Sequence, residues 1–282
     1  MPWPRRDIIV EDTQVLDTAP RALRRLAVAW QHPVTRAIEP VGVLECDEAG
    51  YRFRYVRNAL HVEGFRPLLG FPDLHRTYES TRLFPLFAQR VMDARRPDYG
   101  RYLTQLHLPE DAEPFELLGR SGGHRKGDTI QLCPEPFVAL DGSTRSIFLV
   151  NGVRHVLAAD PTAERRFASL QPGERLVLVN EPDNDWNDRA ILVSARDRRR
   201  LGWVPGLLLD YVHTVRDQGE PSLVVEHVNG PEAPPHLRLL VRLTGHVPAG
   251  YRPFTGPRWE PVSPRHEQDG PDPLVVPPDA TA

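Results

Sequence analysis

The chain has 282 residues, and its 35 Lys and Arg against 38 Asp and Glu give a formal net charge of -3. A hydrophobic content of 40% with 26% charged residues is ordinary for a soluble globular protein, and the length suits two domains. No apolar run approaches the roughly 20 residues that cross a bilayer, and no apolar stretch forms a secretory signal, so we expect a cytoplasmic protein. The charge excludes a binder that holds nucleic acid by bulk electrostatics.

Cysteine, histidine and lysine are used sparingly. Cys46 and Cys133 are the only cysteines; we expect both to be reduced and buried. The 11 histidines show no metal-ligand spacing, so neither a metal nor another cofactor is expected. Because Lys126 is the only lysine, a phosphate contact would come from an arginine fork.

The two ends of the chain differ from its middle. Residues 1–38 are expected to form an N-terminal helical segment, because Leu23, Leu26 and Ala27 share one face of a helix over residues 19–30. Residues 261–282 are rich in proline and poor in apolar surface, which predicts a disordered tail.

Residues 39–140 mix short strands and helices. Residues 51–56 (YRFRYV) alternate aromatics and arginines and predict a strand. The segments RPLL at 66–69, LFPLFA at 83–88 and PFELLGRSGG at 114–123 follow it. This succession resembles the N-terminal subdomain of HipA-type kinases and its free-standing counterpart in three-gene toxin–antitoxin modules. No catalytic or metal-binding Asp motif of the kinase follows, so the resemblance implies a regulatory or docking part.

No motif predicts catalysis. Residues 121–128 (SGGHRKGD) lack the order of a phosphate-binding loop, because Lys126 precedes a glycine, and a tight turn is favoured. Ser80 and Ser121 lack the context of a nucleophile elbow. We therefore expect that the protein is not an enzyme.

From about residue 146 the pattern is mainly β. A helix is expected after Pro205, where Leu207, Leu208, Tyr211 and Val212 share one face. Short apolar runs between turn signals predict strands at residues 148–156 (broken by Asn-Gly), 176–179, 190–193, 201–204, 223–228 and 237–243. Several short strands with one helix favour a small barrel.

Five short motifs carry a second resemblance. They are GVRH at 152–155, GERL at 173–176, EPDN at 181–184, NDRAI at 187–191 and LGWVP at 201–205. In this order they resemble the HIRAN family over residues 146–259, which implies an OB/SH3-like β-barrel. The expected fold is α+β and mostly β: helical segment 1–38, HipA-N-like domain 39–140, HIRAN-like barrel 141–260 and tail 261–282.

HIRAN domains of eukaryotic fork-remodelling proteins capture the 3′ end of single-stranded DNA. The resemblance implies that Arg154 faces phosphate and that His155 stands where the family often has a stacking tyrosine. Trp186 takes the place of the aromatic that packs on the terminal base, and Asn187 that of an aspartate that bonds the terminal hydroxyl. Two departures are that Asn187 lacks charge and that Gly206 replaces a lysine. The implied DNA-binding residues are Arg154, His155, Asn184, Trp186, Asn187 and Trp203.

Structural interpretations compete with these roles. Trp186 could equally cap the barrel core, and its Asn/Asp-rich loop could be an ordinary turn. His155 next to Arg154 could lie on the surface without a ligand. The run Arg196–Arg200 contains Asp197, so a solvated hairpin tip is favoured there.

Two functions follow from the sequence. The first is a non-catalytic, bacterial DNA-binding adaptor that recognises single-stranded ends or distorted DNA. Its N-terminal domain would dock a nuclease, helicase or HipA-like kinase in repair, phage defence or a toxin–antitoxin setting. Residues 145–260 hold 15 Arg against 14 Asp and Glu, so affinity must come from a focused pocket. The alternative is an antitoxin-like interaction module that regulates a separate HipA-like kinase without binding DNA.

Overall fold

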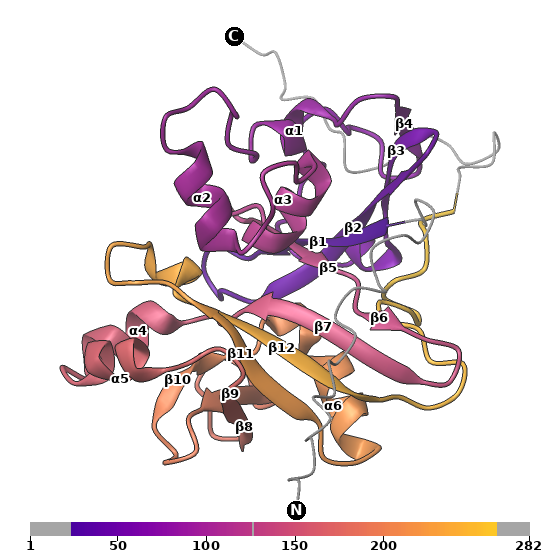
Figure 1. Ribbon diagram of the computed structural model, residues 1–282. Coiled ribbons are helices and arrows are strands. Elements are labelled where there is room, and N and C mark those ends of the chain that lie inside the picture. Colours follow the sequence, from indigo (N-terminus) through magenta and orange to yellow (C-terminus); the bar gives the residue numbers. More distant parts are fainter. Residues whose placement is uncertain (1–23, 126, 264–282) are drawn as a thin grey trace, which may run out of the picture.

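The computed structural model describes residues 24–125 and 127–263, which fold into two antiparallel sheets with six α-helices (Figure 1). The strands are β1 (Arg24–Gln31), β2 (Ile38–Asp47), β3 (Gly50–Tyr55), β4 (Tyr78–Ser80), β5 (Ile130–Pro134), β6 (Phe137–Val138), β7 (Ser143–Leu149), β8 (Arg175–Glu181), β9 (Ala190–Ser194), β10 (Arg200–Trp203), β11 (Ser222–Val228) and β12 (Leu239–His246). The helices are α1 (Pro85–Ala88), α2 (Tyr99–Leu106), α3 (Pro114–Ser121), α4 (Val153–Ala159), α5 (Ala163–Ser169) and α6 (Leu209–Asp217), with 3₁₀ turns η1 (Arg57–Leu60), η2 (Gly206–Leu208) and η3 (Pro235–Leu237). The expected α+β, mostly β class is confirmed.

The N-terminal half is a five-stranded sheet in the order β4-β3-β2-β1-β5. Its core is aromatic: the ring of Phe53 on β3 lies 4.4 Å from that of Phe71 and 5.7 Å from that of Phe87 on α1. The Tyr55 hydroxyl donates to the Phe71 carbonyl at 2.7 Å, and burial raises the pKa of Tyr55. The strand predicted at residues 51–56 is confirmed.

The helix expected over residues 19–30 is wrong for its described part, because residues 24–31 form β1, an interior strand of this sheet between β2 and β5. Leu26 to Ala29 are all buried, since β1 is covered on both faces. A strand buried on both sides has a continuous apolar run, which a helical period fits equally well. Residues 1–23 lie outside the described residues.

The C-terminal half is a seven-stranded sheet in the order β10-β9-β8-β11-β12-β7-β6. It curves without closing: within the described residues no ladder joins the edge strands β10 and β6. The expected small barrel with one helix is observed as an open, curved sheet with three helices, α4, α5 and α6. The helix predicted after Pro205 is confirmed as η2 and α6, which buries Tyr211, Val212 and Val215 in the core.

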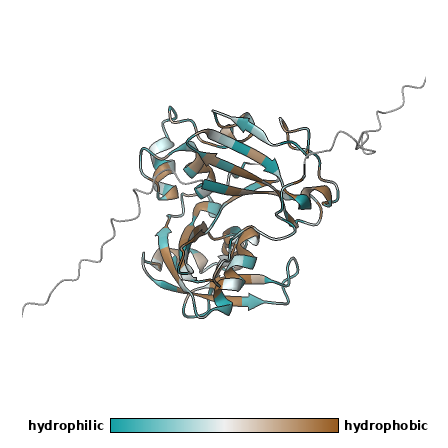
Figure 2. Ribbon diagram, turned by 90° about the vertical axis from the view of Figure 1, so that its right-hand side faces the viewer, coloured by the Kyte–Doolittle hydropathy of each residue, from teal (hydrophilic) through white to brown (hydrophobic). Residues whose placement is uncertain are grey.

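The two halves share a core and are tied together at several points. Ala27 of β1 and Cys133 of β5 belong to the same buried cluster as Phe148 of β7. After β12 the chain returns to the first sheet, where the Val262 N–H donates to the Tyr55 carbonyl at 3.2 Å. The expected tail therefore includes ordered residues up to 263; its remainder, 264–282, lies outside the described residues. Figure 2 shows both halves from the side, with hydrophobic and hydrophilic stretches along their strands.

Within the described ranges, no helix is long and apolar enough to span a membrane.

Both cysteines are buried and unpaired, as expected. Burial raises the pKa of the Cys133 thiol to about 12, so almost none of it is the reactive thiolate near pH 8. We expect a thiol-reactive dye to label Cys133 only after denaturant is added. The measurement is dye absorbance together with peptide mapping. Rapid labelling of Cys133 in the native protein would contradict the packing.

Candidate functional site

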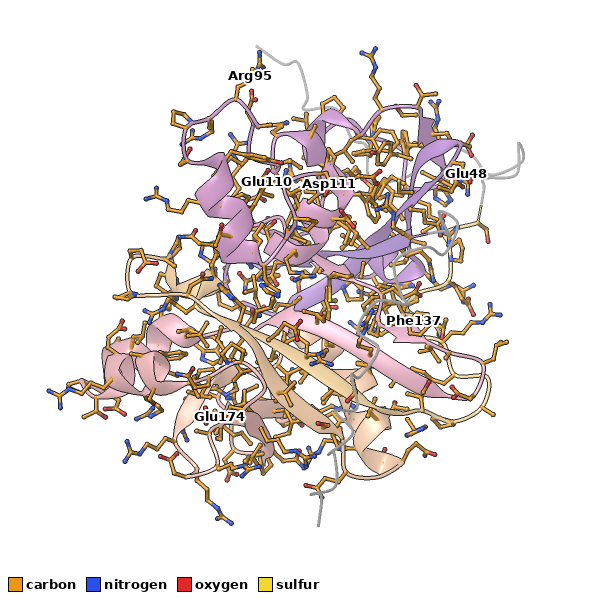
Figure 3. The ribbon with its side chains drawn as sticks, viewed as in Figure 1. Glu48, Arg95, Glu110, Asp111, Phe137 and Glu174 are labelled. Atoms are coloured by element: carbon orange, nitrogen blue, oxygen red, sulfur yellow. The ribbon has the colours of Figure 1, made fainter. Side chains whose placement is uncertain are left out.

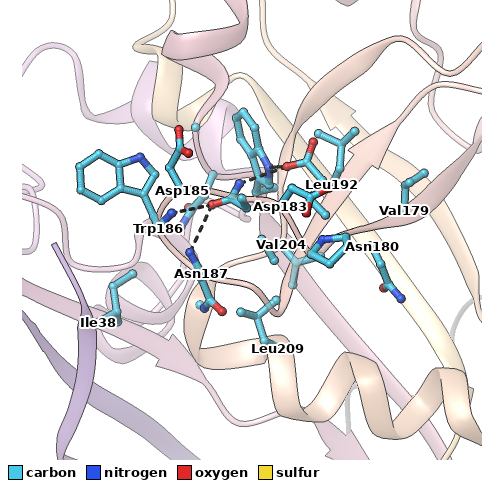
Figure 4. Close-up of a pocket in the computed structure, with 18 of the residues that line it drawn as sticks. Ile38, Val179, Asn180, Asp183, Asp185, Trp186, Asn187, Leu192, Val204 and Leu209 are labelled. Carbon is cyan, nitrogen blue, oxygen red and sulfur yellow. Dashed lines mark hydrogen bonds between the residues drawn. The ribbon is translucent and has the colours of Figure 1, made fainter. Parts of the chain in front are cut away.

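The outward face of β8, β9 and β10 forms the floor of a pocket of about 1270 Å³ (Figure 4). The strand register places Val177 opposite Ser194, and Val179 opposite Leu192, on this face. Val177 and Val179 are 39% and 38% exposed. Apolar side chains that remain accessible on a sheet give the floor a surface suited to a flat apolar ligand.

The loop between β8 and β9 is organised by Asn184. Its Oδ1 accepts the backbone N–H groups of Trp186 at 3.1 Å and Asn187 at 3.3 Å, and its Nδ2 donates to Glu181 at 3.1 Å. Figure 4 labels Trp186 and Asn187 beside the pocket and marks hydrogen bonds of this loop with dashed lines. Asn184 is thus a positioning residue, and the loop it holds presents Trp186 with 74% of its surface exposed. The alternative in which Trp186 caps the core is excluded.

Trp203 forms a fixed wall of the pocket. Its Nε1 donates to the Glu181 carboxylate at 2.6 Å, and its backbone N–H donates to the Asn151 carbonyl at 2.8 Å. A Cβ on Gly152 would lie 2.5 Å from the Trp203 ring, so glycine is required for this close approach. Arg200 also pairs with Glu181, at 3.1 Å.

Arg154 and His155 lie on helix α4, so their expected place on a strand is wrong. β7 ends at Leu149, and Gly152 with φ of 74° begins the helix. Val153 and Val156 are buried at helical spacing. The Asn-Gly turn signal was interpreted as a break within a strand, although it marks the start of this helix. His155 lines the pocket, whereas Arg154 does not line it and donates from Nε to His155 Nε2 at 3.1 Å.

The pocket also contains residues that the sequence did not indicate. One wall comes from the N-terminal half, at Arg36, Ile38 and Glu39, and Arg258 also lines it. No local pattern could indicate these positions, because their place depends on how the two halves pack. Arg198 and Arg200 line the pocket too, although a solvated hairpin tip was favoured for them.

Two polar side chains at the pocket have unused hydrogen-bonding groups. Ser194 is 1% exposed, and its Oγ has no partner among the described residues. Asn187 Oδ1 accepts the Arg189 N–H at 2.9 Å, while its Nδ2 has no partner in the described part of the chain.

The charges that line the pocket are balanced. Arg200 pairs with Glu181, and Arg258 pairs with Glu39 at 2.6 Å. Arg36 and Arg198 on the positive side, and Asp183 and Asp185 on the negative side, have no ion-pair partner within residues 24–125 and 127–263. Over the same ranges no group of three or more His, Cys, Asp or Glu side chains is arranged to hold a metal ion. Net charge therefore contributes little at this pocket, and shape and stacking must supply most of the affinity for a ligand.

Helix α5 supports β10 through Arg166, which is 8% exposed. Arg166 donates to the Arg200 carbonyl at 2.9 Å and pairs with Asp160 at 2.5 Å. The hydrogen bond from Arg166, followed by those from Thr162, lowers the pKa of Asp160 to about 2.

Because the ordinary pKa of Asp160 is 3.8, this carboxylate stabilises the fold above pH 3.8 and loses that contribution as the pH falls towards 2. We expect Asp160→Asn to be less stable than the wild type at pH 7, with the difference shrinking between pH 5 and 2. Urea unfolding across this pH range measures it. A difference that does not change with pH would contradict the role of the pair.

The fold and pocket define an α+β protein whose open, curved sheet carries an accessible aromatic pocket. No protein-family model and no curated protein matches the chain. A solved structure of a protein from Lactobacillus plantarum matches 37% of this chain over 100% of its own length, with 24% identity and a TM-score of 0.28. The HIRAN domain of human HLTF matches 38% of this chain over 78% of its own length, with 18% identity and a TM-score of 0.26.

The resemblance to HIRAN expected from the sequence is thus met by a solved HIRAN domain among the matches. At these identities and TM-scores the likeness carries no argument about the fold or the ligand of this chain. Neither of these two proteins is described as a HipA-type kinase, and that resemblance stays a prediction.

Proposed function

We propose that this chain is a non-catalytic protein that binds single-stranded DNA in the pocket on β8, β9 and β10. One observation carries the proposal. Five of the six residues that the sequence implied as DNA-binding line this single pocket, and the sixth, Arg154, bonds to one of them. The five are His155, Asn184, Trp186, Asn187 and Trp203.

The chemistry of the pocket fits an unpaired base better than a duplex. Single-strand binders stack bases on aromatic side chains and hold the backbone with cations. Trp186 offers an exposed ring at one end, and Val177 and Val179 offer an apolar floor. A paired base cannot present its face to Trp186 without leaving the stack.

Asn187 determines what end chemistry we expect. Its carbonyl oxygen is already bonded to the Arg189 N–H, while its Nδ2 donors are unused among the described residues. An amide oxygen accepts two hydrogen bonds, so Asn187 offers a remaining lone pair to a hydroxyl proton as well as its Nδ2 donors to a phosphate oxygen or a base carbonyl. We therefore propose that the pocket does not favour a 3′-hydroxyl over a 3′-phosphate.

Fluorescence anisotropy on the full chain at low salt tests this proposal. We expect single strands with a 3′-hydroxyl and a 3′-phosphate to bind with similar affinity, and a blunt duplex to bind more weakly. Arg154→Ala, which removes the donor to the pocket residue His155, is expected to weaken binding, whereas Arg165→Ala, which removes an equal charge from an exposed side chain with no bond to a described pocket residue, is not. The absence of binding to any strand at low salt would refute the proposal.

A second candidate function is partner docking by the N-terminal half. Leu69, in the segment that resembles HipA-type proteins, is 81% exposed and offers an apolar contact. Co-purification of a kinase encoded beside this gene, lost in Leu69→Asp, would support it. The same kinase recovered equally with Leu69→Asp would place the contact elsewhere, and no kinase recovered would refute it.

A further inference from the structure

Two arginines that line the pocket combine unpaired guanidinium groups with a left-handed backbone conformation, which is uncommon for residues other than glycine. Arg36 and Arg198 have no side-chain hydrogen bond or ion pair within the described ranges, whereas Arg200 and Arg258 in the same pocket are paired. Arg36 has φ of 62° and Arg198 has φ of 63°, in the left-handed region. Side chains larger than glycine adopt this region at an energetic cost, and such strain gathers at functional sites.

Both arginines are held by the turns that contain them. The Arg36 N–H donates to the His32 carbonyl at 3.0 Å, and the Arg36 carbonyl accepts from Gln31 Nε2 at 3.2 Å. The Arg198 N–H donates to the Ala195 carbonyl at 2.9 Å. The backbones are therefore fixed while the guanidinium groups are left to solvent or ligand.

The two arginines lie at opposite ends of the pocket floor. Arg198 belongs to the hairpin after Ser194, where β9 ends. Arg36 lies two residues before Ile38, which Figure 4 shows at the end of the pocket occupied by Trp186. Strand β9 runs between these ends over five residues, which is about 13 Å at the rise of an extended chain.

We infer that Arg36 and Arg198 bind two phosphates of one DNA strand, so that the ligand is an oligonucleotide that crosses the floor of the pocket. This inference rests on the proposed function. Asp183 and Asp185 repel phosphate from the first part of the loop, so the cationic contacts to the DNA backbone fall to the two arginines. The N-terminal half thereby becomes part of the binding site, since it supplies Arg36.

Glycine substitutions test this without endangering the fold, because glycine adopts positive φ freely. Binding of a fluorescent octanucleotide is measured against salt concentration for Arg36→Gly, Arg198→Gly and the double variant. Each lost phosphate contact should reduce the salt slope by about 0.7, and the pair by about 1.4. Arg101→Ala and Arg196→Ala remove exposed charges outside the pocket and should keep the wild-type slope. A single nucleotide is too short to contact both arginines and should be affected by one variant at most.

The possible outcomes distinguish failure of the two phosphate contacts from failure of DNA binding in the pocket. If the wild type binds no strand, both fail. If the wild type binds and Trp186→Ala weakens binding, but both glycine variants keep the slope of the control variants, the inference is overturned and the pocket stands.

An uncharged surface control is provided by Phe137→Ser. Figure 3 labels Phe137 at β6, and its side chain is 57% exposed.

Discussion

Replacing Trp186 by alanine is expected to weaken the binding of single-stranded DNA roughly tenfold to a hundredfold. A base stacked on an aromatic side chain contributes about 1–3 kcal/mol, and about 1.4 kcal/mol corresponds to a factor of ten. The free energy of unfolding should hardly change, because 74% of the Trp186 surface is exposed. Anisotropy titration and urea unfolding of the same sample measure both quantities.

The matched control is Trp186→Phe, which keeps an aromatic face and should retain most of the affinity. The Asn184 side chain holds the backbone N–H groups of residues 186 and 187, so the loop itself does not depend on the ring. Equal loss in both variants would show that the indole acts through something other than stacking. Unchanged binding in Trp186→Ala would remove the central contact of the proposed site.

The second large effect is expected at Gly202 on β10. Its φ is 144°, and an added Cβ would lie 2.4 Å from the Asn151 carbonyl oxygen and 2.6 Å from Val150 Cγ1. We expect Gly202→Ala to lower the free energy of unfolding by about 3 kcal/mol, from backbone strain of about 1–3 kcal/mol and overpacking of about 1–3 kcal/mol. DNA binding should fall with it, because the neighbouring Trp203 pairs with Asn151.

Gly173→Ala is the control for this effect. Gly173 also has a positive φ, of 81°, but no atom lies within 4 Å of an added Cβ. Only the backbone cost of about 1–2 kcal/mol should remain. Equal destabilisation of the two variants would mean that the close contact between β10 and the chain before α4 is absent. Urea unfolding curves give the comparison.

Much of the C-terminal half could be predicted because its local signals agree with its tertiary structure. β8, β9 and β10 are short apolar runs that end at turn residues, and Pro205 begins the helical region η2 and α6. The alternation of YRFRYV at 51–56 likewise matched β3, since aromatic and arginine side chains lie on opposite faces.

The secondary-structure predictions that were wrong fall where tertiary contacts override a local pattern. β1 is apolar on both faces because a buried cluster lies on each side of the sheet, with Ala27 in one and Leu26 and Val28 in the other, so its run LAVA fits either period. Arg154 and His155 lie on a helix rather than on the predicted strand. β7 ends at Leu149, and beyond it the chain pairs only at the isolated bridge between Asn151 and Trp203 before α4 begins. Such a bridge joins residues about 50 positions apart, which no local pattern reveals.

The residues of the pocket likewise divide into those that local sequence indicated and those that only tertiary packing brings together. The sequence indicated the residues of the Trp186 loop, which are close together in the chain and bonded to one another. It did not indicate Arg36, Ile38 or Arg258, which enter the pocket from the other half of the molecule. The basic run Arg196–Arg200 divides: Arg199 pairs with Asp197 at 3.0 Å, as a solvated turn would, whereas Arg198 lines the pocket.

Photocrosslinking tests the central claim, that single-stranded DNA binds in this pocket, most directly. A strand with a halogenated uracil at its 3′ end is irradiated with the full-length protein, and the adduct is located by mass spectrometry. We predict that the adduct forms on Trp186, and that an unlabelled single strand suppresses it better than a blunt duplex does. An adduct confined to the five-stranded sheet, away from the residues that line the pocket, would contradict the account.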